Sequence, residues 1–252
     1  MKNIKGMKVY VEPSYEAMSR VAAQLVGAQV RLYPNSVLGL ATGGTPVGMY
    51  KELVRMYKEE GLDFSQIITF NLDEYYPLSR ESDQSYYYYM TENLFGHVNI
   101  CKDHIHIPNG EAEDVDLECR NYEKQIQEAG GIDLQVLGIG NNGHIGFNEP
   151  DDAFAKTTHR VDLVEETIQA NSRFFDSIDQ VPKQALSMGI GSIIQAKKIV
   201  LLANGAHKAK IIAETIYGDV RPQVPSTILQ FHPDVTFILD QEAAAELKKY
   251  EK

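Results

Sequence analysis

LGIGNNGHIGFNEP, at residues 137–150, joins an apolar run to a glycine-rich loop that carries His144 and Glu149. The apolar run covers residues 134–139 and is typical of a buried strand. Glycines at four positions of the loop allow backbone turns that other residues resist. A packed core seldom needs an imidazole and a carboxylate in such a loop, and α/β proteins place their chemistry at the carboxyl ends of central strands. We therefore expect this loop to be the catalytic centre.

A second glycine turn, ATGGTP at residues 41–46, follows a short apolar strand and precedes a helical pattern. Thr45 suits the N-cap of that helix, and Pro46 suits its first turn. A strand, a glycine turn and a helix N-terminus together present backbone N–H groups and a positive dipole end, which favours phosphate. The P-loop pattern fails because no Gly-Lys-Ser/Thr follows. A plain strand-to-helix turn fits the same residues.

Other chemistry-bearing side chains follow predicted strands or lie on predicted helices. Asp73 comes directly after the strand at residues 67–72, Lys208 opens a helix after the strand at residues 199–203, and Arg173 lies on the helical stretch 165–175. Any one acid can merely cap a turn, and any one lysine is usually solvated. Taken together with the His/Glu loop, they indicate acid–base chemistry on a small phosphorylated metabolite.

Strands alternate with helices along the whole chain, ending with a strand at residues 235–239 and a helix expected at residues 241–251. This alternation predicts an α/β fold with a doubly wound, mostly parallel sheet and helices on both faces. No internal repeat or Pro/Gly/Ser linker interrupts the 252 residues, so we expect a single domain over residues 1–252.

The composition excludes several classes of protein. A formal net charge of -11 argues against general nucleic-acid binding. No stretch is apolar and long enough to span a membrane, and residues 1–10 lack a signal peptide's apolar block. Cys101 and Cys119 form neither a CxxC pair nor a zinc spacing. We expect a cytoplasmic protein with reduced thiols, no membrane association and no metal.

Residues 138–143, GIGNNG, match the dinucleotide fingerprint GxGxxG. That fingerprint requires a helix to begin at the loop. Here Gly146 and Pro150 oppose a helix, so we expect no dinucleotide cofactor.

Five motifs, in order, resemble the glucosamine-6-phosphate deaminase (glucosamine/galactosamine-6-phosphate isomerase) family over nearly the whole chain. They are LGLATGGTP at 38–46, FNLDEY at 70–75, GIGNNGHIGFNEP at 138–150, ANSRFF at 170–175 and HKA at 207–209. The resemblance implies a Rossmann-like α/β fold. It also implies conversion of glucosamine 6-phosphate and water to fructose 6-phosphate and ammonium in amino-sugar catabolism, without a redox cofactor or metal.

The resemblance assigns a role to each matching residue. Asp73 would be the base that takes the proton from C2 and helps deliver one to C1. His144 would open the pyranose ring, with Glu149 and Asn142 orienting its imidazole. The phosphate would be held by Thr42, Gly43, Gly44, Thr45, Arg173 and Lys208. An imidazole suits ring opening because its reference pKa is about 6.5, and helix-end N–H groups with basic side chains suit a phosphate dianion.

Three features bear on how closely the chain follows the family. Many members carry Asp where this chain has Asn142, so we expect His144 to depend more on Glu149. The serine, arginine and lysine that bind the activator N-acetylglucosamine 6-phosphate in allosteric members align with Asp152, His159 and Val161. We expect that activator site to be absent and the protein to be a monomer or small homo-oligomer. Residues 165–175 resemble the family's mobile lid.

Two other functions remain open from the sequence. A 6-phosphogluconolactonase has a similar fold, glycine turn and Gly-His loop, but typically continues towards Ser-Leu-Phe-Pro where this chain has GFNEP at residues 146–150. A sugar-phosphate-sensing domain of a transcription regulator is a non-enzymatic alternative, although the chain is acidic and shows no added helix-turn-helix segment. Release of ammonium distinguishes the deaminase from both.

Overall fold

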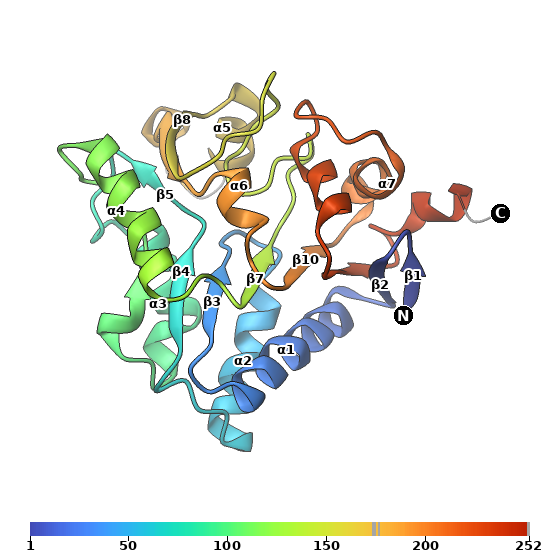
Figure 1. Ribbon diagram of the computed structural model, residues 1–252, viewed down its shortest axis with the longest axis horizontal. Coiled ribbons are helices and arrows are strands. Elements are labelled where there is room, and N and C mark those ends of the chain that lie inside the picture. The colour runs from blue at the N-terminus through green and yellow to red at the C-terminus, as the bar shows by residue number, and fades with distance from the viewer. Residues whose placement is uncertain (173–174, 176, 251–252) are drawn as a thin grey trace.

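A computed structural model describes residues 1–172, 175 and 177–250 (Figure 1). In this part of the chain the main sheet has eight strands in the order β1-β2-β11-β10-β7-β3-β4-β6. Only the β1–β2 pair is antiparallel, so the sheet is mostly parallel as expected. The strands are β1 (Lys2–Ile4), β2 (Met7–Glu12), β3 (Val37–Leu40), β4 (Ile68–Asn71), β6 (Ile105–His106), β7 (Leu134–Leu137), β10 (Ile199–Ala203) and β11 (Val235–Asp240).

Seven α-helices lie in the described residues: α1 (Tyr15–Leu32), α2 (Val47–Glu60), α3 (Tyr86–Asn93), α4 (Val115–Glu128), α5 (Glu165–Asn171), α6 (Ile190–Ile193) and α7 (Ala209–Tyr217). Ser14 and Ser85 cap α1 and α3 through their side-chain oxygens, as serine does at many helix starts. The N-cap predicted for α2 is wrong. Pro46 occupies that position, and the Thr45 hydroxyl instead donates to Asn204 Oδ1 at 2.9 Å.

The chain changes its direction of travel across the sheet once, so that the connections leaving the neighbouring strands β3 and β7 run to opposite sides. From β2 the chain moves through α1, β3, α2 and β4 to β6 at one edge, then returns through α4, β7, β10 and α7 to β11. Parallel crossovers are right-handed almost without exception, so opposite directions of travel place the two sets of helices on opposite faces. Figure 1 shows α1 and α2 side by side on one of them. The carboxyl ends of β3 and β7 therefore border the crevice where such sheets bind ligands.

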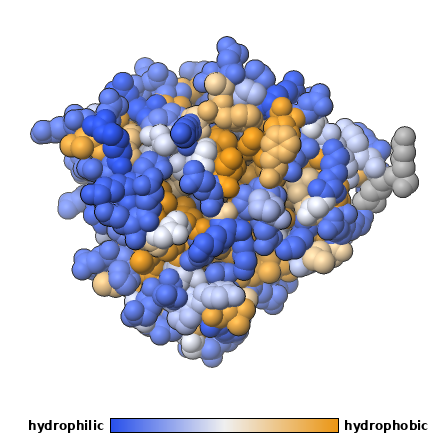
Figure 2. Space-filling view, viewed as in Figure 1, coloured by the Kyte–Doolittle hydropathy of each residue, from blue (hydrophilic) through white to orange (hydrophobic). Residues whose placement is uncertain are grey.

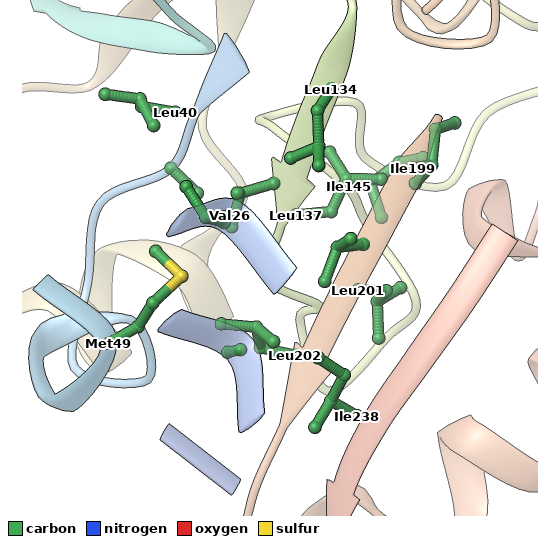
Figure 3. Packing of buried hydrophobic residues seen from close by; sticks show 14 of the residues in the cluster. Val26, Leu40, Met49, Leu134, Leu137, Ile145, Ile199, Leu201, Leu202 and Ile238 are labelled. Atoms are coloured by element: carbon green, nitrogen blue, oxygen red, sulfur yellow. The ribbon is translucent and has the colours of Figure 1, made fainter. Parts of the chain in front are cut away.

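The core lies between the sheet and its helices (Figure 3). Leu40, Leu137 and Leu201 come from three of the central strands, and Val26 and Met49 come from α1 and α2; all are buried. Burying such side chains contributes about 1.5–3 kcal/mol each relative to leaving them in water. This packing holds the ends of the central strands in place.

A second, three-stranded antiparallel sheet was not predicted. It has the order β5-β9-β8 and consists of β5 (Asp73–Tyr76), β9 (Gln184–Ser187) and β8 (His159–Asp162). A separate apolar cluster packs against it, containing Tyr75, Phe147, Leu163, Ile168, Val181 and Ala185. Because β5 starts immediately after β4, this sheet and its cluster form one side of the crevice.

The C-terminal segment and the surface complete the fold. The helix predicted at residues 241–251 is wrong in its bounds and type, because the chain forms a 3-10 helix over Ala245–Tyr250. Residue 251 lies outside the described residues. No helix in residues 1–172, 175 and 177–250 combines the length and hydropathy needed to cross a bilayer. Figure 2 shows a mostly hydrophilic face with apolar side chains gathered in a few patches.

Candidate active site

A cavity of about 570 Å³ opens at the carboxyl ends of β3, β4, β7 and β10. Residues from the motifs at 38–46, 70–75, 138–150 and 207–209 line it. The predicted site residues on its wall are Thr42, Gly43, Gly44, Thr45, Asp73, Asn142, His144 and Lys208. Segments that are far apart in the sequence, such as residues 42–45 and Lys208, therefore meet around one space.

The imidazole of His144 lies directly against the backbone of Gly140. A side-chain carbon built on Gly140 would come within 2.4 Å of the His144 Cε1 atom, a distance that non-bonded atoms do not tolerate. Gly143 has φ +89°, in the left-handed region that glycine adopts without strain. These two glycines let the loop fold back so that Gly140 N–H donates to the His144 carbonyl at 2.9 Å.

Glu149 has two hydrogen-bond partners within its own loop and one on α5. Its Oε2 accepts from Asn142 Nδ2 at 2.7 Å and lies 3.1 Å from His144 Nδ1, and its Oε1 accepts from the Thr167 hydroxyl at 2.5 Å. Burial raises the pKa of the Glu149 carboxyl, but the hydrogen bonds from His144, Thr167 and Asn142 outweigh burial and hold it below its usual range. Glu149 is therefore an ionised partner for the imidazole.

Asp73 lies at the junction of β4 and β5 and is 6% exposed. A side-chain carbon built on Gly146 would lie 3.7 Å from Asp73 Oδ2, so the carboxylate faces the His144 loop. Burial, with a smaller contribution from the charge of Glu74, raises the pKa of Asp73 to about 8. A carboxylate with a raised pKa is a stronger base, which is what proton abstraction from carbon requires.

Glu74 points away from the cavity and anchors the start of α3. It accepts from the backbone N–H groups of Tyr75, Tyr86 and Tyr87 at 2.9, 2.9 and 3.1 Å. Burial raises its pKa to about 7 against the opposing effect of those N–H groups. We therefore assign Glu74 a structural role at this helix end.

The glycine turn at residues 42–45 forms part of the cavity wall. The carbonyl of Gly43 accepts from Tyr89 Oη at 2.6 Å, and the carbonyl of Gly44 accepts from Tyr15 Oη at 3.1 Å. Gly43 has φ +94°, so a side chain there would strain the turn. These contacts fix the turn ahead of the 14-residue helix α2, whose N-terminus carries the positive end of its dipole.

Lys208 lines the same cavity from the segment that precedes α7. Its Nζ donates to Asn141 Oδ1 at 2.8 Å, and the neighbouring loop is held by Asp240, which accepts from Gly205 N–H at 2.9 Å. Arg173, the other predicted basic residue, lies outside the described residues. The structure thus brings together nine of the ten predicted site residues, with Glu149 just behind the wall.

Sequence reasoning missed several residues of the cavity wall, among them Tyr86, Thr167 and Asn204. Tyr86 starts α3, and its ring stacks on Phe147 at 6.2 Å between centroids. It belongs to a run of four tyrosines in which nothing in the sequence singles out one ring. Thr167 and Asn204 are isolated polar residues whose partners, Glu149 and Thr45, are distant in sequence.

The structure also bears on cofactor binding. Residues 138–150 form turns and an isolated bridge between Ile145 and Asn148, so the helix that the dinucleotide fingerprint requires does not start there. Among the described residues, no cluster of three or more His, Cys, Asp or Glu side chains is arranged to hold a metal ion.

The sequence of this chain matches a family of known proteins. A family model described as glucosamine-6-phosphate isomerases/6-phosphogluconolactonase matches residues 13–237. The chain belongs to this family of sugar-phosphate enzymes, which confirms the resemblance seen in its motifs.

Individual proteins with high sequence identity to this chain are named glucosamine-6-phosphate deaminases. The chain is 60% identical to a glucosamine-6-phosphate deaminase of Halothermothrix orenii over 96% of this chain and 100% of that protein. It is 59% identical to the deaminase of Thermoanaerobacter pseudethanolicus over 95% and 94% of the two chains.

Solved structures with the same fold include two kinds of enzyme. One described as a monomeric glucosamine-6-phosphate deaminase has TM-score 0.93 at 46% identity, and covers 95% of this chain and 100% of its own. The 6-phosphogluconolactonase of Trypanosoma cruzi has TM-score 0.72 at 22% identity, covering 96% and 97%, a likeness of fold alone. The Rossmann-like α/β class expected from the motifs is confirmed.

Proposed function

We propose that this protein is a glucosamine-6-phosphate deaminase, which converts glucosamine 6-phosphate and water to fructose 6-phosphate and ammonium in amino-sugar breakdown. The observation that carries the proposal is that a buried carboxylate, Asp73, and the imidazole of His144, which contacts Glu149, face one cavity whose wall also includes a glycine turn before a helix. The relatives at 60% and 59% identity carry this activity in their names.

The phosphate end would be bound by the turn at residues 42–45, by Lys208 and by Arg173. The glycine turn offers backbone N–H groups at the start of α2, and Lys208 adds a cation on the same wall. A phosphate fixed there orients the rest of the sugar along the cavity, which converts binding energy into alignment of the reacting carbons.

His144 would open the pyranose ring. Its imidazole takes the proton of the C1 hydroxyl and returns a proton to the ring oxygen, which leaves an open-chain aldehyde. Glu149, ionised beside Nδ1, stabilises the imidazolium that forms between the two transfers. In this chain Asn142 donates to Glu149, where an aspartate would place a second negative charge beside the first.

Asp73 would then isomerise the open chain. Its carboxylate takes the proton from C2, and that electron pair forms the C1–C2 double bond of an enolamine. The C1–O π bond breaks at the same time, and the C1 oxygen takes a proton from the substrate's ammonium group. The protonated acid then returns its proton to C1. The resulting C2 imine adds water and expels ammonia, which leaves as ammonium. Burial suits Asp73 to this task because the raised pKa strengthens it as a base.

One assay tests the proposal. The purified protein is incubated with glucosamine 6-phosphate, and ammonium and fructose 6-phosphate are measured; equal amounts of both are expected. A parallel incubation with 6-phosphogluconolactone is expected to show only its spontaneous hydrolysis. Lactone hydrolysis without ammonium release would favour the lactonase, and tight sugar-phosphate binding without turnover would favour a sensor domain.

Gly140→Ala is expected to lower kcat by roughly 10²-fold while the fold is retained, an effect in the range of general acid–base catalysis. The added carbon would overlap the His144 ring, at 2.4 Å from Cε1, so the imidazole must leave its place beside Glu149. Steady-state kinetics and circular dichroism measure the two effects.

Lys208→Met is expected to raise KM for glucosamine 6-phosphate by at least roughly tenfold, because a charged hydrogen bond to phosphate contributes about 1.5–3 kcal/mol. Lys210→Met removes the same charge from an exposed position on α7 and should leave KM unchanged. Equal KM values for both variants would place the phosphate elsewhere.

Further properties form part of the proposal. We infer one catalytic domain over residues 1–252, a cytoplasmic location, and a monomer or small homo-oligomer without nucleic-acid or membrane partners. We also infer that N-acetylglucosamine 6-phosphate does not activate the protein, because Asp152 would repel its phosphate where allosteric relatives have serine. A hyperbolic substrate curve unchanged by that compound is expected; a sigmoidal curve that it sharpens would contradict this.

A further inference from the structure

Thr167 is a polar residue on the inner face of α5. Only Thr167 and Ile168 are buried among the helix residues whose side chains are described, at 4% and 9% exposure. Ile168 enters the apolar cluster under the second sheet. A valine would fill the place of Thr167 with the same shape, so the hydroxyl is useful only if it forms a hydrogen bond.

That hydrogen bond goes to the catalytic loop. The Thr167 hydroxyl donates to Glu149 Oε1 at 2.5 Å, whereas the loop's own donors, Asn142 and His144, both meet Oε2. The carboxylate is thus held at one oxygen by its loop and at the other by α5. Without the second contact it can rotate about its terminal bond and turn Oε2 away from the imidazole.

We propose that Thr167 is a positioning residue: its hydroxyl fixes Glu149 so that the His144–Glu149 pair is aligned only when α5 is seated against the loop. The kinetic part of this inference rests on the proposed deaminase function. Phe175, whose ring meets Tyr75 edge-on at 5.7 Å between centroids, packs against the same apolar cluster as Ile168 of α5. Because the Thr167 hydroxyl belongs to α5, seating of this helix and alignment of the catalytic pair are one event.

Thr167→Val tests the role, with Thr167→Ser as the conservative variant. The matched control is Thr158→Val, because Thr158 is also buried, at 5% exposure, and its hydroxyl donates to Glu123 Oε1 at 2.6 Å outside the cavity. If the valine variant at 167 does not fold, Thr167→Ala replaces it. For every variant we would measure kcat, KM and the pKa of the Glu149 carboxyl. Carbon NMR measures that pKa, and the Glu149→Gln variant identifies the Glu149 signal.

Thr167→Val is expected to lower kcat roughly tenfold with little change in KM, the size expected for losing a hydrogen bond to a charged group. It should also raise the pKa of the Glu149 carboxyl, because the hydroxyl supports the ionised form. Thr167→Ser should restore both values, and Thr158→Val should change neither.

The inference is overturned if kcat for Thr167→Val stays within about twofold of wild type, or if Thr158→Val lowers kcat equally. An unchanged Glu149 titration in Thr167→Val would also overturn it. Should the wild-type protein release no ammonium while Thr167→Val still shifts the Glu149 titration, the contact would stand and the proposed function would fall instead.

Discussion

Asp73→Asn is expected to lower kcat for ammonium release by roughly 10³- to 10⁴-fold, the upper part of the range for a general base. The amide keeps the shape of the side chain but cannot take the proton from C2. Binding should change little, because the phosphate seat at residues 42–45 and Lys208 is untouched. Steady-state kinetics measure both values, and Asp73→Glu tests whether a displaced carboxylate recovers part of the rate.

The pH dependence of the wild type should identify the same group. Since burial raises the pKa of Asp73 to about 8, kcat/KM should rise with pH up to that region and then level off. Asp73→Asn should lack this rise in its residual rate. A wild-type profile that is flat between pH 6 and pH 9, which is about one unit or more to each side of the expected value, would exclude Asp73 as the base.

The same substitution should stabilise the fold at alkaline pH. An unfolded chain releases the Asp73 proton near its ordinary pKa of about 3.9, whereas the folded protein keeps it up to about 8. Wild-type stability therefore falls as pH rises through that window, and Asp73→Asn escapes the loss. The Tm difference between the variant and wild type should grow from pH 5 to pH 8, about the span between the two pKa values, and then stay constant.

Glu149→Gln is expected to lower kcat by roughly 10²-fold, since a hydrogen bond to a charged group contributes about 1.5–3 kcal/mol and general acid–base steps reach this size. The ionised carboxylate stabilises the His144 imidazolium at 3.1 Å from Nδ1, and a neutral amide cannot. Its bonds with Asn142 and Thr167 must also rearrange. The variant should bind substrate normally, which KM measures.

Asn142→Ala is the comparison for that result. It removes one donor to Glu149 but leaves the carboxylate ionised and in contact with His144 and Thr167. Asn142 is only half-buried, so water can replace the lost hydrogen bond, and we expect a loss of a few-fold. Equal rates for Glu149→Gln and wild type would remove Glu149 from the catalytic pair.

Much of the main sheet could be predicted because its strands are short apolar runs that end in glycine or polar residues. The run at residues 134–139 and the glycines after it predicted β7 and the loop that follows. Asp73 was singled out because it comes directly after the strand predicted at residues 67–72, which is β4 in the structure. Parallel strands place their carboxyl ends at one edge, so these residues were expected to meet. Placement of the site rests on this rule.

The second sheet could not be predicted in the same way. Its strands β5, β8 and β9 are four residues each, and β5 pairs with β9 across more than 100 positions, as in Asp73 with Ser187. Local sequence carries no signal for such pairing. Thr45 was wrongly placed as an N-cap for a related reason, because its partner Asn204 lies on another strand-end loop.

Thr167 shows the same limit at the site itself. A single threonine on a short amphipathic helix resembles any half-buried surface residue, and only the folded chain places its hydroxyl beside Glu149. Tyr86 is likewise hidden in a run of four tyrosines until α3 turns one ring towards the cavity. Sequence motifs therefore indicated the proposed reacting groups, and the structure was needed to find the residues that contact them.

A crystal structure with 2-amino-2-deoxyglucitol 6-phosphate, the reduced open-chain form of the substrate, tests the arrangement most directly. The phosphate is expected to contact residues 42–45 and Lys208, with C1 and C2 beside Asp73 and the C1 oxygen towards His144. A phosphate bound elsewhere, or a carbon chain that leaves Asp73 and His144 on separate sides without contact, would contradict the assignment.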